Sequence, residues 1–230
     1  TRRRLGIDAE TVRARNPRII WTAISGFGLT GPEAEKPGYD VIAQAMSGTM
    51  ALTGGPDDGP IRFPTPMADI TTGMYAAMGI LGALYEREWS GEGQEIDVAL
   101  FDSQLTWLSN IASAYLATGN PPTKRGNVHP NIAPYQPFRA ADGRFILAAG
   151  TEPHWKRVLE VIGASETIGR DNRFATNADR VTNRVEMEEA LNAFFTTQTV
   201  DVWIDRFQSA GVPCGPILPP DQAISHPHIA

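Results

Sequence analysis

The sequence has little cysteine, no concentration of positive charge and no long uninterrupted hydrophobic run. Its single cysteine, Cys214, excludes a disulfide within the chain and leaves no second thiol for a redox or metal pair. We expect Cys214 to be a small buried side chain. The net charge of −6 argues against a nucleic-acid partner, because phosphate binding needs clustered Lys and Arg. The one basic run, residues 2–4, is expected to be solvated.

Other absences exclude further classes of site. The longest apolar stretch, residues 76–85, is too short to cross a bilayer, so no membrane partner is expected. His226 and His228 have no recognisable third ligand nearby, so no metal site is expected. The sequence has neither a Gly-x-Ser-x-Gly turn nor a Cys–His signature, which argues against the common serine and cysteine nucleophiles.

The hydrophobic content of 42% in 230 residues is enough for one large domain or two small ones. In the first half, the pattern predicts strands at 18–24 and 94–98. It predicts helices at 8–15, 39–50, 70–85 and 101–115, with a Gly-rich loop at 25–32. Gly and two Pro at 119–122 end the last helix and predict a domain boundary.

The pattern changes beyond that boundary. Residues 138–140 and 144–149 read as two short strands joined by a hairpin turn, followed by helices at 153–162, 184–196 and 200–210. An extended piece at 212–217 follows. The mixture of helices and strands predicts an α/β protein.

Asp69 immediately precedes the strongest helical pattern in the chain, and two interpretations of it remain open. It could be an N-cap, whose carboxylate accepts hydrogen bonds from free backbone N–H groups. The same geometry would hold an ionised carboxylate able to attack an activated acyl group. Gly73, Gly79 and Gly82 follow within the helix at a cost of about 1 kcal/mol each, which indicates close approach by another backbone or a ligand.

Tyr39 and Asp40 form a second candidate pair. They could be an aromatic anchor followed by an ordinary first-turn Asp, or a hydrogen-bonding pair facing a ligand. The Gly-rich loop before them lacks the GxGxxG and GxxxxGK[ST] spacings, so it is a weak phosphate motif.

Taken together, the motifs resemble the class III CoA-transferases (CaiB/BaiF type), which include formyl-CoA:oxalate and carnitine CoA-transferases. The matching segments are 16–20, 25–32, 37–40, 46–48, 53–54, 69–75 and 91–103, with 125–127, 132–136 and 211–216 further along. Their order and spacing fit across nearly the whole chain.

The resemblance implies that Asp69 is the catalytic nucleophile and that Gly38, Tyr39 and Asp40 bind CoA or substrate. It implies an acyl-CoA donor and a small carboxylic acid acceptor, with the CoA thioester as substrate and no permanently bound cofactor. Gly150, Thr151 and Glu152 are our candidates for a loop that covers the site. An interlocked homodimer, a cytoplasmic location and a role such as carnitine metabolism are further expectations.

The resemblance also implies a domain organisation. Residues 1–119 would be part of a large Rossmann-like domain, incomplete here, and 120–137 a linker. Residues 138–217 would form a smaller α+β domain, and 218–230 the start of a return to the large domain. The family's first part, which carries much of the CoA site, would be missing, so this chain alone is expected to be inactive.

Two alternatives remain. The family includes α-methylacyl-CoA racemases, which resemble this chain but carry His in place of Tyr39. A phenol with a pKa of about 10 is a poor base near neutral pH, so Tyr39 favours transfer. The other alternative is an inactive fragment that only binds CoA or dimerises.

Overall fold

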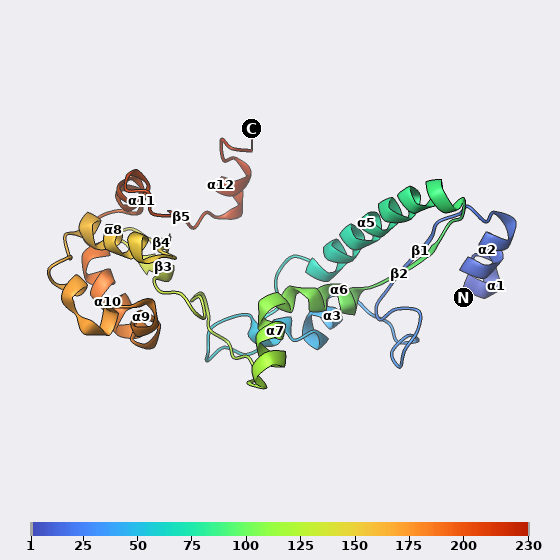
Figure 1. Cartoon of the computed structure of the whole chain (residues 1–230), viewed down its shortest axis with the longest axis horizontal. Helices are drawn as coiled ribbons and strands as arrows, with labels where there is room; N and C mark the ends of the chain where they lie inside the picture. The colour runs from blue at the N-terminus through green and yellow to red at the C-terminus, as the bar shows by residue number, and fades with distance from the viewer. Residues whose placement is uncertain (1, 230) are drawn as a thin grey trace. The chain divides into compact units, whose positions relative to one another are not determined.

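The computed structural model describes residues 2–229 and divides the chain into two compact units, Thr1–Gly126 and Asn127–Ala230. Each unit combines helices with a small sheet, which confirms the predicted α/β class (Figure 1). The boundary between the two units falls within residues 120–137, the segment predicted to be a linker.

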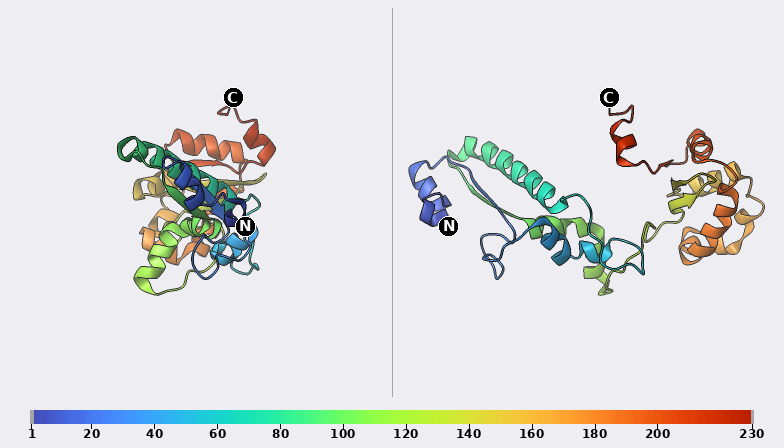
Figure 2. Two further views of the ribbon diagram at one scale, coloured as in Figure 1. Left: turned by 90° about the vertical axis from the view of Figure 1, so that its right-hand side faces the viewer. Right: turned by 180° about the vertical axis from the view of Figure 1, so that it is seen from behind.

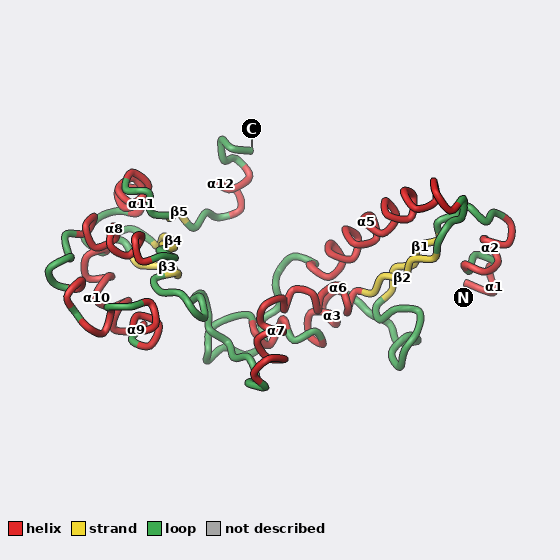
Figure 3. The backbone as a smooth tube through the Cα atoms, in the orientation of Figure 1, coloured by secondary structure: helices red, strands yellow, loops and turns green. Residues whose placement is uncertain are grey.

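The first unit is built around a two-stranded parallel sheet. Its elements are α1 (Arg2–Leu5), α2 (Ala9–Arg15), β1 (Trp21–Ser25), α3 (Asp40–Met46), α4 (Thr49–Leu52), α5 (Met67–Ser90), β2 (Glu95–Ala99), α6 (Leu100–Leu105), the 3₁₀ turn η1 (Thr106–Leu108) and α7 (Ser109–Thr118). Strand β1 pairs with β2 from Trp21 opposite Glu95 to Ser25 opposite Ala99. Figure 3 shows the long loop that joins β1 to α3.

The long helix α5 packs beside this pair of strands. A Cβ added to Gly79 would lie 3.2 Å from Cγ2 of Ile96 in β2, so this glycine permits the helix to approach the strand. Gly73 and Gly82 have open space around them. The predicted close approach of another backbone therefore does not occur at these two positions among the residues described.

Two helices expected to be continuous are interrupted. Gly48, with φ of +85°, separates α3 from α4, and the hydroxyls of Ser47 and Thr49 both donate to the Gln44 carbonyl there. The helix expected over 101–115 breaks at η1, and Ser109 has φ of +40°. At that break Thr106 Oγ1 donates to the Ser103 carbonyl over 2.7 Å, so side-chain hydrogen bonds compete with the regular helix.

By length and composition alone, α5 could cross a membrane. The apolar stretch 76–85, which is too short to cross a bilayer, is thus only part of a helix of 24 residues. A single such helix is weak evidence, because core helices of soluble proteins pass the same test. The absence of a membrane partner stays a prediction.

The second unit contains an antiparallel sheet covered by helices. Its elements are β3 (Tyr135–Arg139), β4 (Arg144–Ala148), α8 (Glu152–Ile162), η2 (Ile168–Arg170), η3 (Asn172–Phe174), α9 (Asn177–Thr182), α10 (Arg184–Phe195), α11 (Val200–Ser209), β5 (Cys214–Pro216) and α12 (Pro220–Ile224). The strand order is β3-β4-β5. Within this unit, α12 lies apart from the other helices (Figure 2).

Aromatic rings fill the core of the second unit. Phe195 lies at its centre, with its ring centroid 5.3 Å from those of Phe138 and Phe145 and 5.4 Å from that of Trp203. Edge-to-face contacts of this kind stabilise the core by more than the burial of the apolar ring surface alone. Cys214 is partly buried against this core and its thiol donates to the Ile204 carbonyl.

Candidate functional site

The first turn of α5 carries the candidate nucleophile. Met67 begins the helix and the N-cap position belongs to Pro66, which makes no side-chain capping bond. Asp69 therefore lies inside the first turn and is not the N-cap. Its side chain is exposed and accepts no hydrogen bond from any residue between 2 and 229. The carboxylate is free to meet a ligand.

Asp40 of α3 supplies the cap that α5 itself lacks. Its Oδ1 accepts a hydrogen bond from the Ala68 N–H over 2.8 Å. Its Oδ2 accepts one from Nε2 of the buried Gln44 over 2.7 Å. A carboxylate at this position also interacts favourably with the helix dipole. Both carboxylate oxygens of Asp40 thus have protein partners.

Two causes raise the pKa of Asp69 above its ordinary value of 3.8. The larger is partial desolvation of the carboxylate, and the second is the negative charge of Asp40. A carboxylate with a raised pKa is a better nucleophile once it is ionised, because nucleophilicity increases with basicity. A carboxylate with a raised pKa at the end of a helix makes Asp69 a candidate nucleophile.

Gly38 and Tyr39 lie just before α3. Gly38 touches Gly26, the first residue after β1: a Cβ on Gly38 would lie 2.4 Å from the Gly26 Cα, and one on Gly26 would lie 2.5 Å from the Gly38 Cα. This contact holds the α3 N-terminus against the end of β1. The Tyr39 side chain is 71% exposed and forms no hydrogen bond with residues 2–229, so it does not anchor the core.

The residues of the candidate covering loop lie in the second unit, at the start of α8. Gly150 is exposed with open space around it, and Thr151 is the N-cap of α8, with Oγ1 accepting from the His154 N–H over 3.3 Å. Whether this loop covers the nucleophile stays a prediction.

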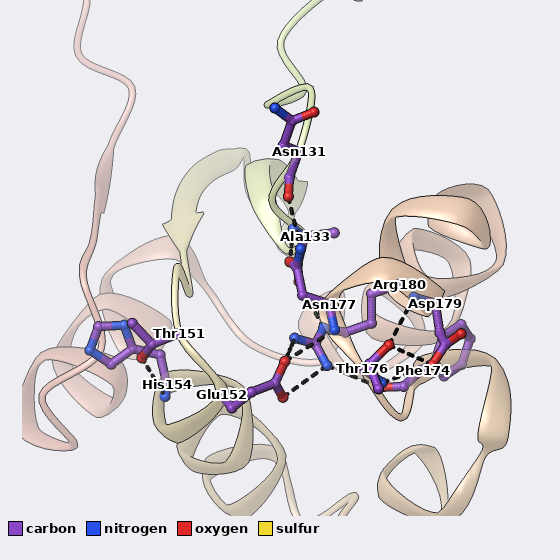
Figure 4. A network of polar contacts seen from close by, with 10 residues as sticks. All are labelled: Asn131, Ala133, Thr151, Glu152, His154, Phe174, Thr176, Asn177, Asp179 and Arg180. Carbon is purple, nitrogen blue, oxygen red and sulfur yellow. Dashed lines mark hydrogen bonds and ion pairs between the residues drawn. The ribbon is translucent and has the colours of Figure 1, made fainter.

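Glu152 has a clear structural partner. Its carboxylate accepts two hydrogen bonds from the Arg180 guanidinium, at 2.6 and 3.2 Å, and one from the Asn177 N–H at 3.0 Å (Figure 4). Arg180 is only 1% exposed and also donates to the carbonyls of Ala133 and Phe174. Glu152 therefore holds the start of α8 to α9.

Two polar residues of these networks were not expected from the sequence. Gln44 interrupts an otherwise apolar helical pattern, which could have indicated a buried hydrogen bond. Arg180 follows a capping box formed by Thr176 and Asp179, which could have predicted α9, but no local signal marks its burial. Among residues 2–229, no group of three or more His, Cys, Asp or Glu side chains is placed to hold a metal ion.

The profile of CoA-transferase family III matches residues 1–230. The chain is 41% identical over 228 residues to the acetyl-CoA:oxalate CoA-transferase of Acetobacter aceti, covering 99% of this chain and 58% of that protein. It is 40% identical to the succinate–glutarate CoA-transferase of Agrobacterium fabrum, covering 97% of this chain and 56% of that protein.

Solved structures agree with these matches. The chain superposes on a CaiB/BaiF family protein from Brucella suis with a TM-score of 0.86 and 41% identity, covering 99% of this chain and 60% of that one. The chain therefore spans less than two thirds of the relatives it matches. The whole-length profile match, the sequence identity and the shared fold establish that the chain belongs to CoA-transferase family III.

Proposed function

We propose that the protein transfers coenzyme A from an acyl-CoA donor to a small carboxylic acid, with Asp69 as the nucleophile. The observation that carries the proposal is the free, exposed carboxylate of Asp69 in the first turn of α5, next to the capping carboxylate of Asp40. The names of the relatives from Acetobacter and Agrobacterium support the reaction type and favour a dicarboxylic acceptor.

The first half of the reaction loads CoA onto the protein. The Asp69 carboxylate attacks the thioester carbonyl, forming a C–O bond and expelling CoA thiolate, which leaves a mixed anhydride. The thiolate then attacks the side-chain carbonyl carbon of Asp69. This step breaks the anhydride, releases the donor acid as its carboxylate and leaves an aspartyl-CoA thioester.

The second half repeats these steps with the acceptor. The acceptor carboxylate attacks the aspartyl thioester and expels the thiolate, giving a second anhydride. The thiolate attacks the acceptor acyl carbon, which yields the new acyl-CoA and restores the Asp69 carboxylate. Because water would hydrolyse the anhydrides, the reacting site must exclude water. We assign this role to the loop of Gly150, Thr151 and Glu152. We assign CoA or substrate contacts to Gly38, Tyr39 and Asp40, and the Asp40 carboxylate also caps the helix that carries Asp69.

The experiment uses the full-length protein with acetyl-CoA or succinyl-CoA and a panel of acceptors, namely oxalate, glutarate and carnitine. We expect a new acyl-CoA with at least one acceptor and, by mass spectrometry, a CoA or acyl adduct on the peptide that contains Asp69. Asp69→Ala is the control and should show neither. Turnover retained by Asp69→Ala would refute the nucleophile assignment. The panel also tests the expected link to carnitine.

The same experiment addresses the alternatives. A racemase would exchange the α-proton of a 2-methylacyl-CoA with deuterated water and leave no adduct on Asp69. Tyr39 disfavours this reaction, because its phenol is a poor base near neutral pH. A fragment that only binds CoA or dimerises would show neither transfer nor exchange. An interlocked homodimer and a cytoplasmic location remain part of the proposal, and sedimentation of the protein tests the first.

A further inference from the structure

Gln44 is a buried polar side chain of α3 that joins two segments of the first unit. It is 1% exposed, and its amide lies between Asp40, one turn earlier in the helix, and residues 63–65, which lead into α5. Oε1 accepts a hydrogen bond from the Phe63 N–H over 2.9 Å. Nε2 donates to Asp40 Oδ2 over 2.7 Å and to the carbonyls of Phe63 and Thr65, both over 3.4 Å. The amide therefore ties α3 to the segment before α5.

The partners of this amide fix its orientation. A backbone N–H only donates, so the end of the amide that meets the Phe63 N–H is the oxygen. The nitrogen is then the end that meets the Asp40 carboxylate. The backbone carbonyl of Gln44 is held as well, because Thr49 Oγ1 donates to it over 3.0 Å at the break between α3 and α4. Gln44 is thus a fixed donor to Asp40.

The hydrogen bond from Gln44 determines which way the Asp40 carboxylate faces. A carboxylate held at one oxygen turns about its Cβ–Cγ bond, whereas a carboxylate held at both oxygens does not. Gln44 holds Oδ2, which leaves Oδ1 facing the Ala68 N–H over 2.8 Å. Ala68 is fully buried and directly precedes Asp69. A change in the orientation of the Asp40 carboxylate would therefore displace the backbone that carries the nucleophile.

We propose that Gln44 is a positioning residue for the Asp69 nucleophile, acting through Asp40 and through the segment 63–65. The inference rests on the reaction proposed for Asp69. Gln44 is buried and does not meet the thioester itself, so its effect is on geometry. A displacement of about 1 Å at a reacting group lowers a rate by as much as about 100-fold, so loss of the Gln44 amide should slow the attack by Asp69.

The test measures a single turnover of the full-length protein. The protein is mixed with excess acetyl-CoA or succinyl-CoA, quenched rapidly, and the adduct on the Asp69 peptide is followed by mass spectrometry. The amplitude reports the fraction of folded protein, whereas the rate constant reports the geometry of Asp69. Gln44→Met removes the amide at similar volume and should lower the rate constant about tenfold or more. A purely structural role would lower the amplitude and leave the rate constant unchanged.

Gln44→Glu is a second variant that keeps the shape of the side chain. The introduced carboxyl still accepts the Phe63 N–H, but it donates to Asp40 only when it is protonated. Burial and the charge of Asp40 favour the protonated form. The rate constant of this variant, divided by that of the unaltered protein at the same pH, should rise at least about threefold as the pH falls from about 9 to about 5.

Other charged groups flank position 44. Asp69 lies in α5 and interacts with Asp40, and Arg62 Nε donates to the Phe63 carbonyl over 3.2 Å. Helix α4 has no titratable side chain, and Asp102 of α6 is exposed. These groups are present in the variant and in the unaltered protein, so taking the ratio of rate constants at each pH removes their shared titration.

Gln104 provides the matched control. It is another buried glutamine of the first unit, 4% exposed, and its Nε2 donates to Thr49 Oγ1 over 3.2 Å and not to Asp40. Gln104→Met and Gln104→Glu leave both partners of Asp40 in place. Their rate constants should stay within about threefold of that of the unaltered protein at every pH, even where the amplitude falls.

The outcomes separate this inference from the proposed function. An unchanged rate constant in Gln44→Met, a ratio for Gln44→Glu that does not vary with pH, or equal slowing in the Gln104 variants would overturn the positioning role alone. Absence of any adduct on Asp69 in the unaltered full-length protein would refute the proposed function, and the positioning role with it.

Discussion

The Asp40 carboxylate lies across the N-terminus of α5, where its Oδ1 accepts the Ala68 N–H over 2.8 Å. A residue 28 positions earlier in the chain thus supplies the cap of the helix that carries Asp69. The same carboxylate contributes to the raised pKa of Asp69. One side chain therefore both caps the helix that carries Asp69 and alters the ionisation of that residue.

Asp40→Ala should destabilise the first unit by about 1–3 kcal/mol, because it leaves the Ala68 N–H without its acceptor and removes the shortest of the three hydrogen bonds of Gln44 Nε2. Urea unfolding measures this change. Asp102→Ala is the matched control. Asp102 is an exposed acidic residue in the first turn of α6, its side chain forms no hydrogen bond within the described range 2–229, and its removal should cost about 0.5 kcal/mol or less. Equal losses in the two variants would show that Asp40 is an ordinary first-turn residue.

Asp40→Asn should shift the pH dependence of transfer. In the proposed mechanism the attacking form of Asp69 is ionised, so we expect kcat/KM of the full-length protein to fall as the pH decreases through the pKa of that carboxylate. Desolvation and then the charge of Asp40 raise this pKa, so removing the charge lowers it. The acidic limb of the kcat/KM profile should move to lower pH. An acidic limb that stays at the same pH, or that moves to higher pH, would contradict the coupling of the two carboxylates.

Asp69→Asn should leave the fold slightly more stable at pH 7 while it abolishes transfer. Because the folded-state pKa of Asp69 is raised, the unfolded chain releases this proton more readily, and ionisation costs folding free energy above that pKa. The gain should be under about 1 kcal/mol, since the carboxylate is exposed and the helix dipole favours its charge. The difference between variant and unaltered protein should vanish as the pH falls below 3.8. Unfolding curves at several pH values check this sign.

The sequence predicted the helices and strands whose signals are local. The apolar period of α5 and the hairpin of β3 and β4 are both set by nearby residues, and both are present. The sequence pattern predicted continuous helices through Gly48 and Ser109, where the structure has breaks. Near both breaks a hydroxyl group donates a hydrogen bond to a backbone carbonyl, which competes with the regular helix. Such competition depends on side-chain positions that a hydrophobic pattern does not contain.

At the candidate site, too, the local features were predictable from the sequence and the long-range contacts were not. The position of Asp69 at the start of a helix followed from the sequence, whereas its cap came from Asp40 through a contact between distant segments. Likewise, the sequence marked Glu152 as a loop residue, but its partner Arg180 lies 28 positions away in α9. Long-range pairs of this kind could not be inferred from one sequence.

Gly26 and Gly38 should not tolerate a side chain. A Cβ at either position would lie 2.5 Å or less from the Cα of the other, and both neighbours are backbone atoms that cannot move aside. We expect Gly26→Ala and Gly38→Ala to destabilise the first unit by several kcal/mol or prevent folding. Gly73→Ala is the control, because open space surrounds Gly73 within α5, and it should stabilise the protein by up to about 1 kcal/mol. Thermal unfolding of the three variants tests this contrast.

Glu152→Gln tests whether Glu152 is primarily structural. The substitution removes the charge that pairs with the buried guanidinium of Arg180. The Glu152 side chain is 49% exposed, so water replaces part of the lost interaction. We expect a loss of about 2 kcal/mol in unfolding free energy for the second unit. Glu166→Gln breaks the exposed ion pair with Arg170 and should cost no more than about 0.5 kcal/mol. If Glu152→Gln unfolds like the unaltered protein yet loses transfer activity, Glu152 acts on the substrate rather than on the fold.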